Sequence, residues 1–383
     1  MRIAILSSGR FHVCDLAREL DALGHDVKFY SCVPKFVTRR FGLPDACHRS
    51  LLLYLAPLFF LMRKTMHSRF GSHFEQFFIS ALDSLAALII EPCDVFIGMS
   101  GMSTKAALAV RRKYKAMIWI ERGSRHILSQ RDILAALPGR RKVTSFSVRR
   151  EQMDYALADT IVIPAQHVER SFLEYSVPGL KLFRNPYGVD LQMFAPTPAP
   201  PLGSQPTIIM VGTWSMQKGC DLLVQAWQHL PGVRLVHVGS VSDVLLPVDP
   251  DFEHHDHVPQ SQLRDYYALA HVFALPSRQE GMAVVQAQAL ACGLRLVCSD
   301  RSGGEDLKDF TATPERISVV AADDVASLAE ALRAALFEAA SETGIRDGMG
   351  GSLNCLSWRA YGERYAAELK HRAPATDNVI PSS

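Results

Sequence analysis

The sequence predicts an α/β protein with two domains, each built around a parallel sheet. In both halves of the chain, short and continuously apolar segments alternate with helical segments, a pattern typical of strands that helices cover on both faces. The chain has 383 residues, which is long for one hydrophobic core and enough for two. Residues 195–206, APTPAPPLGSQP, are rich in proline and alanine, which predicts an extended, semi-rigid linker between the domains.

The first half opens with a predicted strand, helix and strand at residues 3–7, 12–23 and 27–31, and Gly24 ends the helix. The turn after the first strand lacks the G-x-G-x-x-G pattern of dinucleotide sites. The same alternation continues through the rest of the chain. The further predicted elements are strands at 94–99, 117–121, 207–212 and 233–239 and helices at 103–114, 260–270, 324–341 and 353–370.

A second strand-turn-helix unit lies within residues 271–300. A polar turn joins its strand (272–275) to its helix (283–292), so the free N–H groups of the helix start face the carboxyl edge of the sheet, where anions bind. Glu280 lies in this turn. Because a carboxylate repels phosphate, Glu280 indicates a neutral, hydroxyl-rich group attached to the phosphate, such as a sugar; a solvated loop glutamate is the alternative. Gln288 is a candidate for ribose hydroxyls or a helix-surface residue.

A lysine and a glycine at another predicted helix start form a second phosphate-binding candidate. Lys218 and Gly219 follow the strand at 207–212, so a cation and free backbone N–H groups coincide there. An ordinary surface lysine is the alternative interpretation.

Neither the cysteines nor the histidines form a metal-like pattern. The eight cysteines include no C-x-x-C pair, and several fall in predicted strands or helices, where a reduced thiol packs as a small apolar group. The histidines of residues 253–259, EHHDHVP, are nearly consecutive, and neighbours on a strand point to opposite faces. The opening residues are typical of a strand and a turn rather than of a signal peptide. We therefore expect a cytoplasmic protein without a metal site.

Charge is distributed unevenly along the chain. Residues 1–190 carry a net charge of +10 and residues 191–383 one of −8, so we expect the first half to face an anionic partner. Within it, residues 35–75 combine basic side chains with the apolar stretch 51–62, which Pro57 interrupts and which is too short to cross a bilayer. This composition favours peripheral contact with an anionic membrane, at its cytoplasmic face; a buried helix with a solvated basic rim is the alternative.

Residues 276–293 resemble the donor-binding signature of the retaining family 4 glycosyltransferases, which have the GT-B fold: two Rossmann-like domains facing across a cleft. The family pattern is P-S-x-x-E-G followed by E-A-x-A-x-G, with seven residues between the two glutamates. Gln288 takes the place of the second glutamate, so the contact that the family makes there with ribose hydroxyls loses its charge. The matching residues are Pro276, Ser277, Glu280, Gly281, Ala289, Ala291 and Gly293.

The resemblance implies which residues hold a nucleotide-sugar donor. Lys218 and Gly219 match the end of the family's G-R-x(4)-K-G motif, whose arginine and lysine grip the diphosphate, while Thr213 replaces the arginine. Arg278 is a candidate to supply the missing charge. Glu280 would orient the sugar, and Lys218 and the helix start would stabilise the leaving diphosphate without a metal. The other implied donor contacts are Gly212, Gly239, Gly281, Met282, Ala283 and Val284.

The resemblance also implies that the first domain supplies the acceptor side. Many GT-B enzymes have a Gly-containing first turn and a histidine at the start of the first helix, and Gly9, Arg10 and His12 fit that place. We expect Arg10 to meet a phosphate and His12 a substrate hydroxyl. A helix-start residue without a catalytic part is the alternative for His12.

A histidine-containing loop lines the sugar site in family members, and the polar segment 121–127 takes that place here. His126 joins Glu280 and Lys218 as a predicted catalytic residue, and capping of the following helix is its alternative role. The candidates from this loop are Arg122, Ser124 and His126.

The implied function is transfer of a sugar from a nucleotide-sugar donor to an acceptor hydroxyl with retained configuration, in which the leaving phosphate takes the acceptor proton. The expected product is a bacterial surface polysaccharide, lipopolysaccharide or lipid-linked glycan, and no nucleic acid is expected as a partner. Two alternatives stay open: a sugar-nucleotide epimerase on the same fold, and a protein that binds nucleotide or glycan without catalysis. The expected boundaries are 1–194 for the first domain, 195–206 for the linker, 207–350 for the second domain, 351–371 for a helix that crosses back, and 372–383 for a disordered tail.

Overall fold

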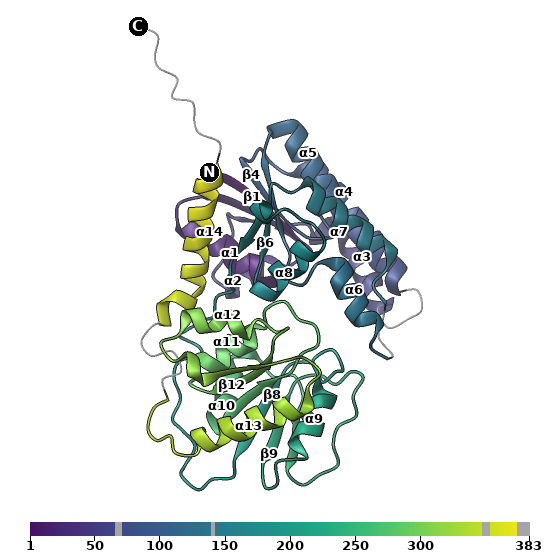
Figure 1. The fold of residues 1–383 in the computed structure, drawn as a ribbon. Helices are drawn as coiled ribbons and strands as arrows, with labels where there is room; N and C mark the ends of the chain where they lie inside the picture. Colours follow the sequence, from purple (N-terminus) through teal and green to yellow (C-terminus); the bar gives the residue numbers. More distant parts are fainter. Residues whose placement is uncertain (66–70, 139–141, 347–352, 374–383) are drawn as a thin grey trace.

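Two parallel sheets organise the chain in the computed structural model, which describes residues 1–65, 71–138, 142–346 and 353–373. Each sheet belongs to one half of the chain, and the two halves lie one above the other in Figure 1. The predicted tail at 372–383 lies outside the described residues, apart from its first two.

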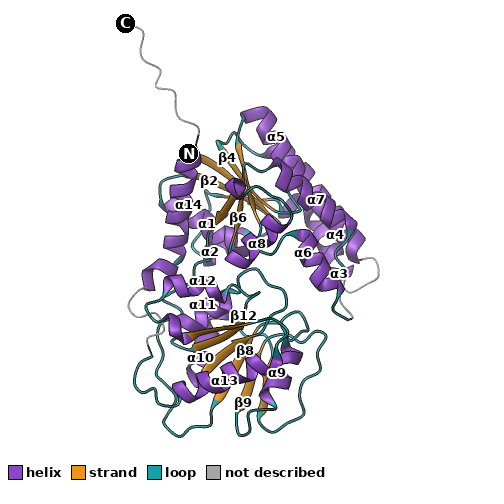
Figure 2. Cartoon of the chain, in the orientation of Figure 1, coloured by secondary structure: helices purple, strands orange, loops and turns teal. Residues whose placement is uncertain are grey.

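The sheet of the first domain has the order β3-β2-β1-β4-β5-β6-β7, and every neighbouring pair is parallel. Helices cover both of its faces (Figure 2). Because the strand order reverses between β1 and β4, the loops at their carboxyl ends diverge, which is where α/β proteins bind ligands. The strands are β1 (Arg2–Ser7), β2 (Asp26–Ser31), β3 (His48–Ser50), β4 (Val95–Met99), β5 (Met117–Glu121), β6 (Thr160–Ile163) and β7 (Leu182–Arg184). The helices are α1 (Phe11–Ala22), α2 (Lys35–Arg40), α3 (Leu52–Thr65), α4 (Gly71–Ile89), α5 (Thr104–Tyr114), α6 (Ile127–Ala135), α7 (Ser145–Leu157) and α8 (Gln166–Glu174).

The sheet of the second domain has the order β10-β9-β8-β11-β12-β13 and is also parallel. Its order reverses between β8 and β11, so the two turns that carry the predicted donor residues flank the reversal point. The strands are β8 (Thr207–Val211), β9 (Arg234–Val238), β10 (Phe252–His255), β11 (Val272–Leu275), β12 (Arg295–Ser299) and β13 (Ile317–Val320). The helices are α9 (Cys220–Trp227), α10 (Leu263–Leu269), α11 (Val284–Ala291), α12 (Gly304–Leu307) and α13 (Val325–Ala339).

After the second domain, helix α14 (Trp358–Arg372) returns to the first domain and packs beside α1 (Figure 1). The approach is close at Gly362, where a Cβ would lie 2.4 Å from the Cβ of Glu19. Tyr365 of α14 packs against Trp119 of β5, with ring centroids 5.2 Å apart. The core of the first domain is therefore completed by a helix that follows the second.

The first part of the linker is fastened to the second domain by hydrogen bonds. The N–H and the hydroxyl of Thr197 both donate to the carbonyl of Cys292, at 3.1 and 2.8 Å, and the N–H of Ala199 donates to Gly344 at 2.8 Å. Because the neighbouring residues Pro196, Pro198 and Pro200 have no N–H, Thr197 and Ala199 supply the donors that fasten this part of the linker to the second domain.

Pro57 does not interrupt the apolar stretch as expected, because α3 continues through it. A proline removes one backbone donor, and in the second turn of a helix only the carbonyl of Leu53 loses its partner. The stretch therefore forms one helix that presents a continuous outer face.

Candidate active site

The turns after β8 and β11 meet at the carboxyl edge of the second sheet. The backbone N–H of Arg278 donates to the carbonyl of Gln217 at 2.9 Å, which ties the two turns together. Within them, Nζ of Lys218 and Oε2 of Glu280 form an ion pair, and the two side chains are 21% and 20% exposed. The residues that the sequence assigns to the phosphate and to the sugar are therefore in direct contact, and both reach solvent.

Three of the predicted glycines occupy positions that a larger residue cannot take. Gly212 and Gly239 have φ angles of 132° and 147°, and a Cβ on Gly239 would lie 2.2 Å from the carbonyl oxygen of Gly212. Gly219 has a φ of 71°, and its Cβ would lie 2.1 Å from the carbonyl oxygen of Pro276. These close backbone approaches allow the turns of adjacent strands to pack together.

Helix α11 begins directly after Glu280 and Gly281. Ala283 is its N-cap residue and makes no side-chain capping bond, so the first N–H groups of the helix have no side-chain acceptor there. The side chains of Met282 and Ala283 are buried. The uncapped N–H groups at this helix start follow Glu280 in sequence, an arrangement that suits an anionic group.

Two predicted donor residues do not have the expected roles. Gln288 is buried, and its Oε1 accepts a hydrogen bond from the hydroxyl of Tyr267 at 3.4 Å, because the helix turns this side chain into the domain. Arg278 binds both carboxylate oxygens of Asp221, at 2.6 and 2.7 Å, and also Asp323, at 2.5 Å. Its charge is balanced inside the domain, so it does not replace the missing arginine.

Thr213 lies where the family motif has that arginine. Its hydroxyl is 3.2 Å from the hydroxyl of Ser240, and the side chain is half-buried. The position therefore offers a hydroxyl instead of a charge, and Lys218 is the cation that these two turns present to solvent.

Gly9, Arg10 and His12 lie at the carboxyl end of β1, beside the reversal point of the first sheet. The guanidinium of Arg10 lies 3.7 Å from the centroid of the Phe41 ring, a cation–π contact. Nε2 of His12 is 2.9 Å from a carboxylate oxygen of Glu121, the last residue of β5. His12 is thus at the predicted edge, held by a carboxylate that the sequence did not single out.

The loop after β5 contacts the turn after β11 in the other domain, residues 276–283, which we name the donor turn. Ser124 and Gly281 form a β-bridge, and the side-chain amide of Gln279 donates to the hydroxyl of Ser124. A Cβ on Gly281 would lie 1.8 Å from the carbonyl oxygen of Gly123. Ser124 was predicted to bind the acceptor. Its hydroxyl instead forms part of the contact that holds the two domains together.

Arg122 and His126 are buried and do not line the site that was expected of them. Arg122 donates to Glu151 at 3.0 Å and to Gln130 at 2.6 Å. Nδ1 of His126 accepts from the backbone at the start of α6, and its ring stacks on Tyr175 with centroids 4.5 Å apart. His126 therefore has its alternative role as a helix cap, because its ring packs among the aromatic side chains of Tyr155, Phe172 and Tyr175.

Acidification is expected to weaken the fold through buried histidines. Between pH 6.5 and pH 4 the folded rings stay neutral while the unfolded ones bind protons, so stability is lost as the pH falls, by about 1.4 kcal/mol per pKa unit for each ring. Thermal unfolding at pH 7 and pH 5 checks this expectation: His126→Gln should flatten the pH dependence and His371→Gln, at an exposed ring, should not. An unfolding temperature that does not change with pH would contradict it. Burial is the main cause that lowers the pKa of four histidines to about 4: His48, His126, His167 and His237.

Further contacts between the domains come from residues that the sequence did not indicate. Nε2 of His167 is 2.7 Å from the carbonyl oxygen of Gly281. The buried carboxylate of Asp306 accepts from the N–H of Gln166, at 2.9 and 3.0 Å, and from Arg184 at 2.6 Å. The start of α8 and a cation thus satisfy this carboxylate. No local pattern marks these pairs, because their members lie far apart in the sequence.

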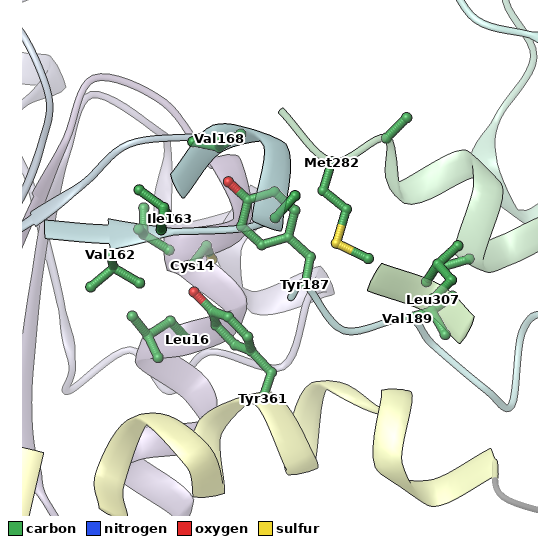
Figure 3. Close-up of a cluster of buried hydrophobic side chains, with 14 of the residues drawn as sticks. Cys14, Leu16, Val162, Ile163, Val168, Tyr187, Val189, Met282, Leu307 and Tyr361 are labelled. Carbon is green, nitrogen blue, oxygen red and sulfur yellow. The ribbon is translucent and has the colours of Figure 1, made fainter. Parts of the chain in front are cut away.

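Apolar packing also continues across the junction (Figure 3). Met282 of the donor turn and Leu307 of α12 lie beside Tyr187 and Val189 of the first domain, close to Tyr361 of α14. The donor turn is therefore anchored to the first domain by packing as well as by hydrogen bonds.

The described ranges hold no group of three His, Cys, Asp or Glu side chains arranged to bind a metal. In EHHDHVP, the rings of His254 and His237 stack with centroids 4.9 Å apart, whereas His255 binds Glu253 at 2.6 Å. Neighbouring histidines thus have separate partners. Independence of the reaction from metals stays a prediction.

Residues 205–337, most of the second domain, match the family model described as glycosyl transferases group 1. The GDP-mannose-dependent alpha-(1-6)-phosphatidylinositol monomannoside mannosyltransferase of Mycolicibacterium smegmatis is 28% identical over 253 residues, which cover 57% of this chain and 64% of the relative. The D-inositol 3-phosphate glycosyltransferase of Xylanimonas cellulosilytica is 35% identical over 146 residues, which cover 31% of this chain and 34% of the relative. The matches thus span less than two thirds of the length of each relative.

Solved structures match nearly the whole chain. The sucrose-phosphate synthase from Thermosynechococcus elongatus superposes with a TM-score of 0.64 at 17% identity, over 97% of this chain and 98% of its own. Anabaena HepE in complex with UDP-glucose gives a TM-score of 0.64 at 12% identity, over 97% of this chain and all of its own (100%). At such identities the likeness shows the fold, and the GT-B fold predicted from the sequence is confirmed.

The fold and the site define a GT-B protein, in which the carboxyl edges of two Rossmann-like domains meet at the turns described above. The second domain matches the model of the glycosyl transferases group 1 family over residues 205–337. This assignment agrees with the family 4 resemblance of residues 276–293. Throughout the described part of the chain, every helix is too short or too polar to cross a membrane.

Proposed function

We propose that this protein transfers a sugar from a nucleotide-sugar donor to an acceptor hydroxyl, with retention of the anomeric configuration. The observation that carries the proposal is the Lys218–Glu280 ion pair at the uncapped start of α11. A cation suited to a diphosphate and a carboxylate suited to sugar hydroxyls are adjacent there, at the reversal point of the sheet. The match of residues 205–337 to the model of glycosyl transferases group 1 supports this interpretation of the pair.

The chemical difficulty of the reaction is the departure of a nucleoside diphosphate from the anomeric carbon. Lys218 and the first N–H groups of α11 are placed to stabilise the negative charge that builds on it. Glu280 would accept hydrogen bonds from the sugar hydroxyls and so fix the ring. In this scheme the bond from the anomeric carbon to the diphosphate breaks, the bond to the acceptor oxygen forms on the same face, and the acceptor proton leaves on the diphosphate.

Screening nucleotide sugars for protection against heat unfolding tests the proposal. A ligand at 100 times its Kd stabilises the folded state by about 2.7 kcal/mol, so GDP-mannose, UDP-glucose and UDP-N-acetylglucosamine can be ranked against ATP. We expect one nucleotide sugar to raise the unfolding temperature in the wild type and to lose this effect in Lys218→Ala. If none of them raises it, the proposal fails.

We further propose that the acceptor is a membrane-anchored or lipid-linked molecule at the cytoplasmic face of the membrane. One relative is named for a phosphatidylinositol monomannoside and another for inositol 3-phosphate, which makes phosphatidylinositol and D-inositol 3-phosphate the first acceptors to try. Helix α3 supports membrane contact, because its exposed residues are mostly apolar and the others are basic. The exposed residues are Leu53, Tyr54, Pro57, Phe60, Leu61, Arg63 and Lys64, which we name the outer face of α3.

Replacing two apolar residues of the outer face of α3 is expected to weaken membrane binding. Leu53 and Phe60 are 89% and 64% exposed, and Arg63 and Lys64 follow them with positive charge. Leu53→Ser with Phe60→Ser should reduce binding to vesicles with anionic phospholipid by about tenfold or more, since burying each side chain contributes about 1 kcal/mol or more. Co-sedimentation measures the binding. Leu180→Ser, at a leucine that is 91% exposed elsewhere, is the matched control. Equal binding of both variants would contradict a role of α3.

A further inference from the structure

Glu121 is a buried carboxylate whose hydrogen-bonding partner is a histidine. It ends β5 at the carboxyl edge of the first sheet and is 1% exposed. Its Oε2 lies 2.9 Å from Nε2 of His12, and within the described ranges no side chain makes a well-formed hydrogen bond to Oε1. Buried carboxylates are normally held by an arginine, a lysine or several backbone N–H groups. The structure instead places the imidazole of His12 against this carboxylate.

The contact with Glu121 determines which nitrogen of His12 carries the hydrogen. A carboxylate accepts, so the neutral ring holds its hydrogen on Nε2 and presents a lone pair on Nδ1. Nδ1 makes no hydrogen bond to any described residue and is not an enclosed atom, in a side chain that is 10% exposed. His12 therefore offers an acceptor to a molecule from outside.

Glu121 and His12, which we name the dyad, lie next to the donor turn, on the side of the first domain. The ring of Tyr187 is 4.4 Å from that of His12, centroid to centroid. Burial raises the pKa of Tyr187, and the charges of Glu121 and Glu280 raise it further, so both carboxylates lie near enough to act on this ring. Gly123, two residues after Glu121, packs against Gly281. A molecule that reached the sugar at Glu280 from the first domain would pass His12.

Helix α14 closes the other side of Glu121. The hydroxyls of Tyr361 and Tyr365 are buried, and the charge of Glu121 is, after burial, a cause that raises the pKa of both. Burial raises the pKa of Asp15 on α1, while the charges of Arg18, Arg10 and His12 lower it. None of these groups replaces Glu121 as the partner of Nε2.

We propose that Glu121 is a positioning residue that fixes the tautomer and the orientation of His12, so that Nδ1 accepts a hydrogen bond from an acceptor hydroxyl that neighbours the reacting one. This inference rests on the proposed function and extends it to the acceptor side. By holding this neighbouring hydroxyl, His12 directs the reacting oxygen toward the anomeric carbon and leaves the reacting O–H hydrogen free to pass to the diphosphate. The acceptor oxygen forms a bond to the anomeric carbon, and the bond from that carbon to the diphosphate oxygen breaks. The electrons of the broken bond and the proton of the reacting hydroxyl leave with the diphosphate.

Nitrogen NMR of the histidines tests the dyad without any substrate. In protein labelled with 15N-histidine, the His12 signals, assigned by their loss in His12→Asn, should show hydrogen on Nε2. Glu121→Gln retains an acceptor of the same shape and should keep this tautomer, whereas Glu121→Leu should lose it. Hydrogen on Nδ1 in the wild-type protein would overturn the proposal.

Kinetics with D-inositol 3-phosphate and phosphatidylinositol vesicles as acceptors then separate positioning from folding. Glu121→Leu should lower kcat/KM for the acceptor by about tenfold or more and leave donor affinity unchanged. Glu121→Gln should keep most of the wild-type kcat/KM. Because Glu121→Leu leaves Nε2 of His12 without its partner, its unfolding temperature is measured as well, and Glu121→Gln, which keeps an acceptor, should retain both the wild-type unfolding temperature and most of the transfer. In the His12→Asn background Glu121→Leu should have no further effect.

The outcomes distinguish this inference from the proposed function. If the wild type binds no nucleotide sugar and transfers nothing, the proposed function fails, and the NMR result still decides on the dyad. If the wild type transfers sugar and Glu121→Leu does so equally well, the proposed function stands and the positioning role of Glu121 is wrong.

Discussion

Replacing Lys218 or Glu280 by alanine is expected to lower the rate of sugar transfer by at least about 100-fold. Lys218→Ala removes the cation that faces the leaving diphosphate and leaves the carboxylate of Glu280 without its partner. Glu280→Ala removes the acceptor for the sugar hydroxyls. Because the two side chains form one ion pair, the double variant should lose much less than the product of the two single losses.

Initial rates at saturating donor measure these losses, and calorimetric titration of the donor separates binding from turnover. Lys308→Ala is the matched control, because this lysine also pairs with a glutamate, Glu305 at 3.3 Å, on the surface of the same domain. Its turnover should stay at the wild-type level. Near-normal transfer by Glu280→Ala would refute the assignment of the sugar site.

Gly281→Ala is expected to abolish most of the activity through a single methyl group. Its Cβ would lie 1.8 Å from the carbonyl oxygen of Gly123, far inside the 3.0 Å limit of real Cβ contacts, so the donor turn and the loop after β5 must move apart. A displacement of about 1 Å at a catalytic site can cost about 100-fold in rate. The expected result is a loss of this size, with each domain still folded.

Small-angle scattering should show a larger radius of gyration for Gly281→Ala, since the domains no longer close. Gly179→Ala is the control: the nearest atom to its Cβ would be 3.6 Å away, an ordinary contact. If Gly281→Ala keeps both the compact shape and the activity, the junction described here is not the one that operates in catalysis.

The fold was predictable because its signals are local. The predicted strands at 117–121 and 272–275 agree with β5 and β11 to the residue, since a short apolar run between polar turns has one favourable conformation in such a domain. Helix ends were less certain. The helix predicted at 260–270 is a 3-10 turn, Gln260–Gln262, followed by α10, because its first turn lacks a capping side chain.

The candidate site was predictable on the second domain and much less so on the first. Lys218 and Glu280 belong to turns whose spacing is fixed by the strands before them, so their meeting follows from the topology. His126 and Arg122 were assigned by a loose likeness of loops, and the direction in which such side chains point depends on distant partners. Glu121 was not singled out, because nothing in the sequence shows that a side chain at the end of β5 contacts one at the start of α1.

The return of α14 has a consequence for synthesis of the chain. Tyr361 and Tyr365 of α14 belong to the core around Trp119. The first domain is translated first, but its core stays incomplete until α14 has emerged from the ribosome. The second domain, whose strands and helices all precede α14, finishes before it. A nascent chain halted ahead of Trp358 should therefore leave Trp119 accessible to fluorescence quenchers and depend on chaperones.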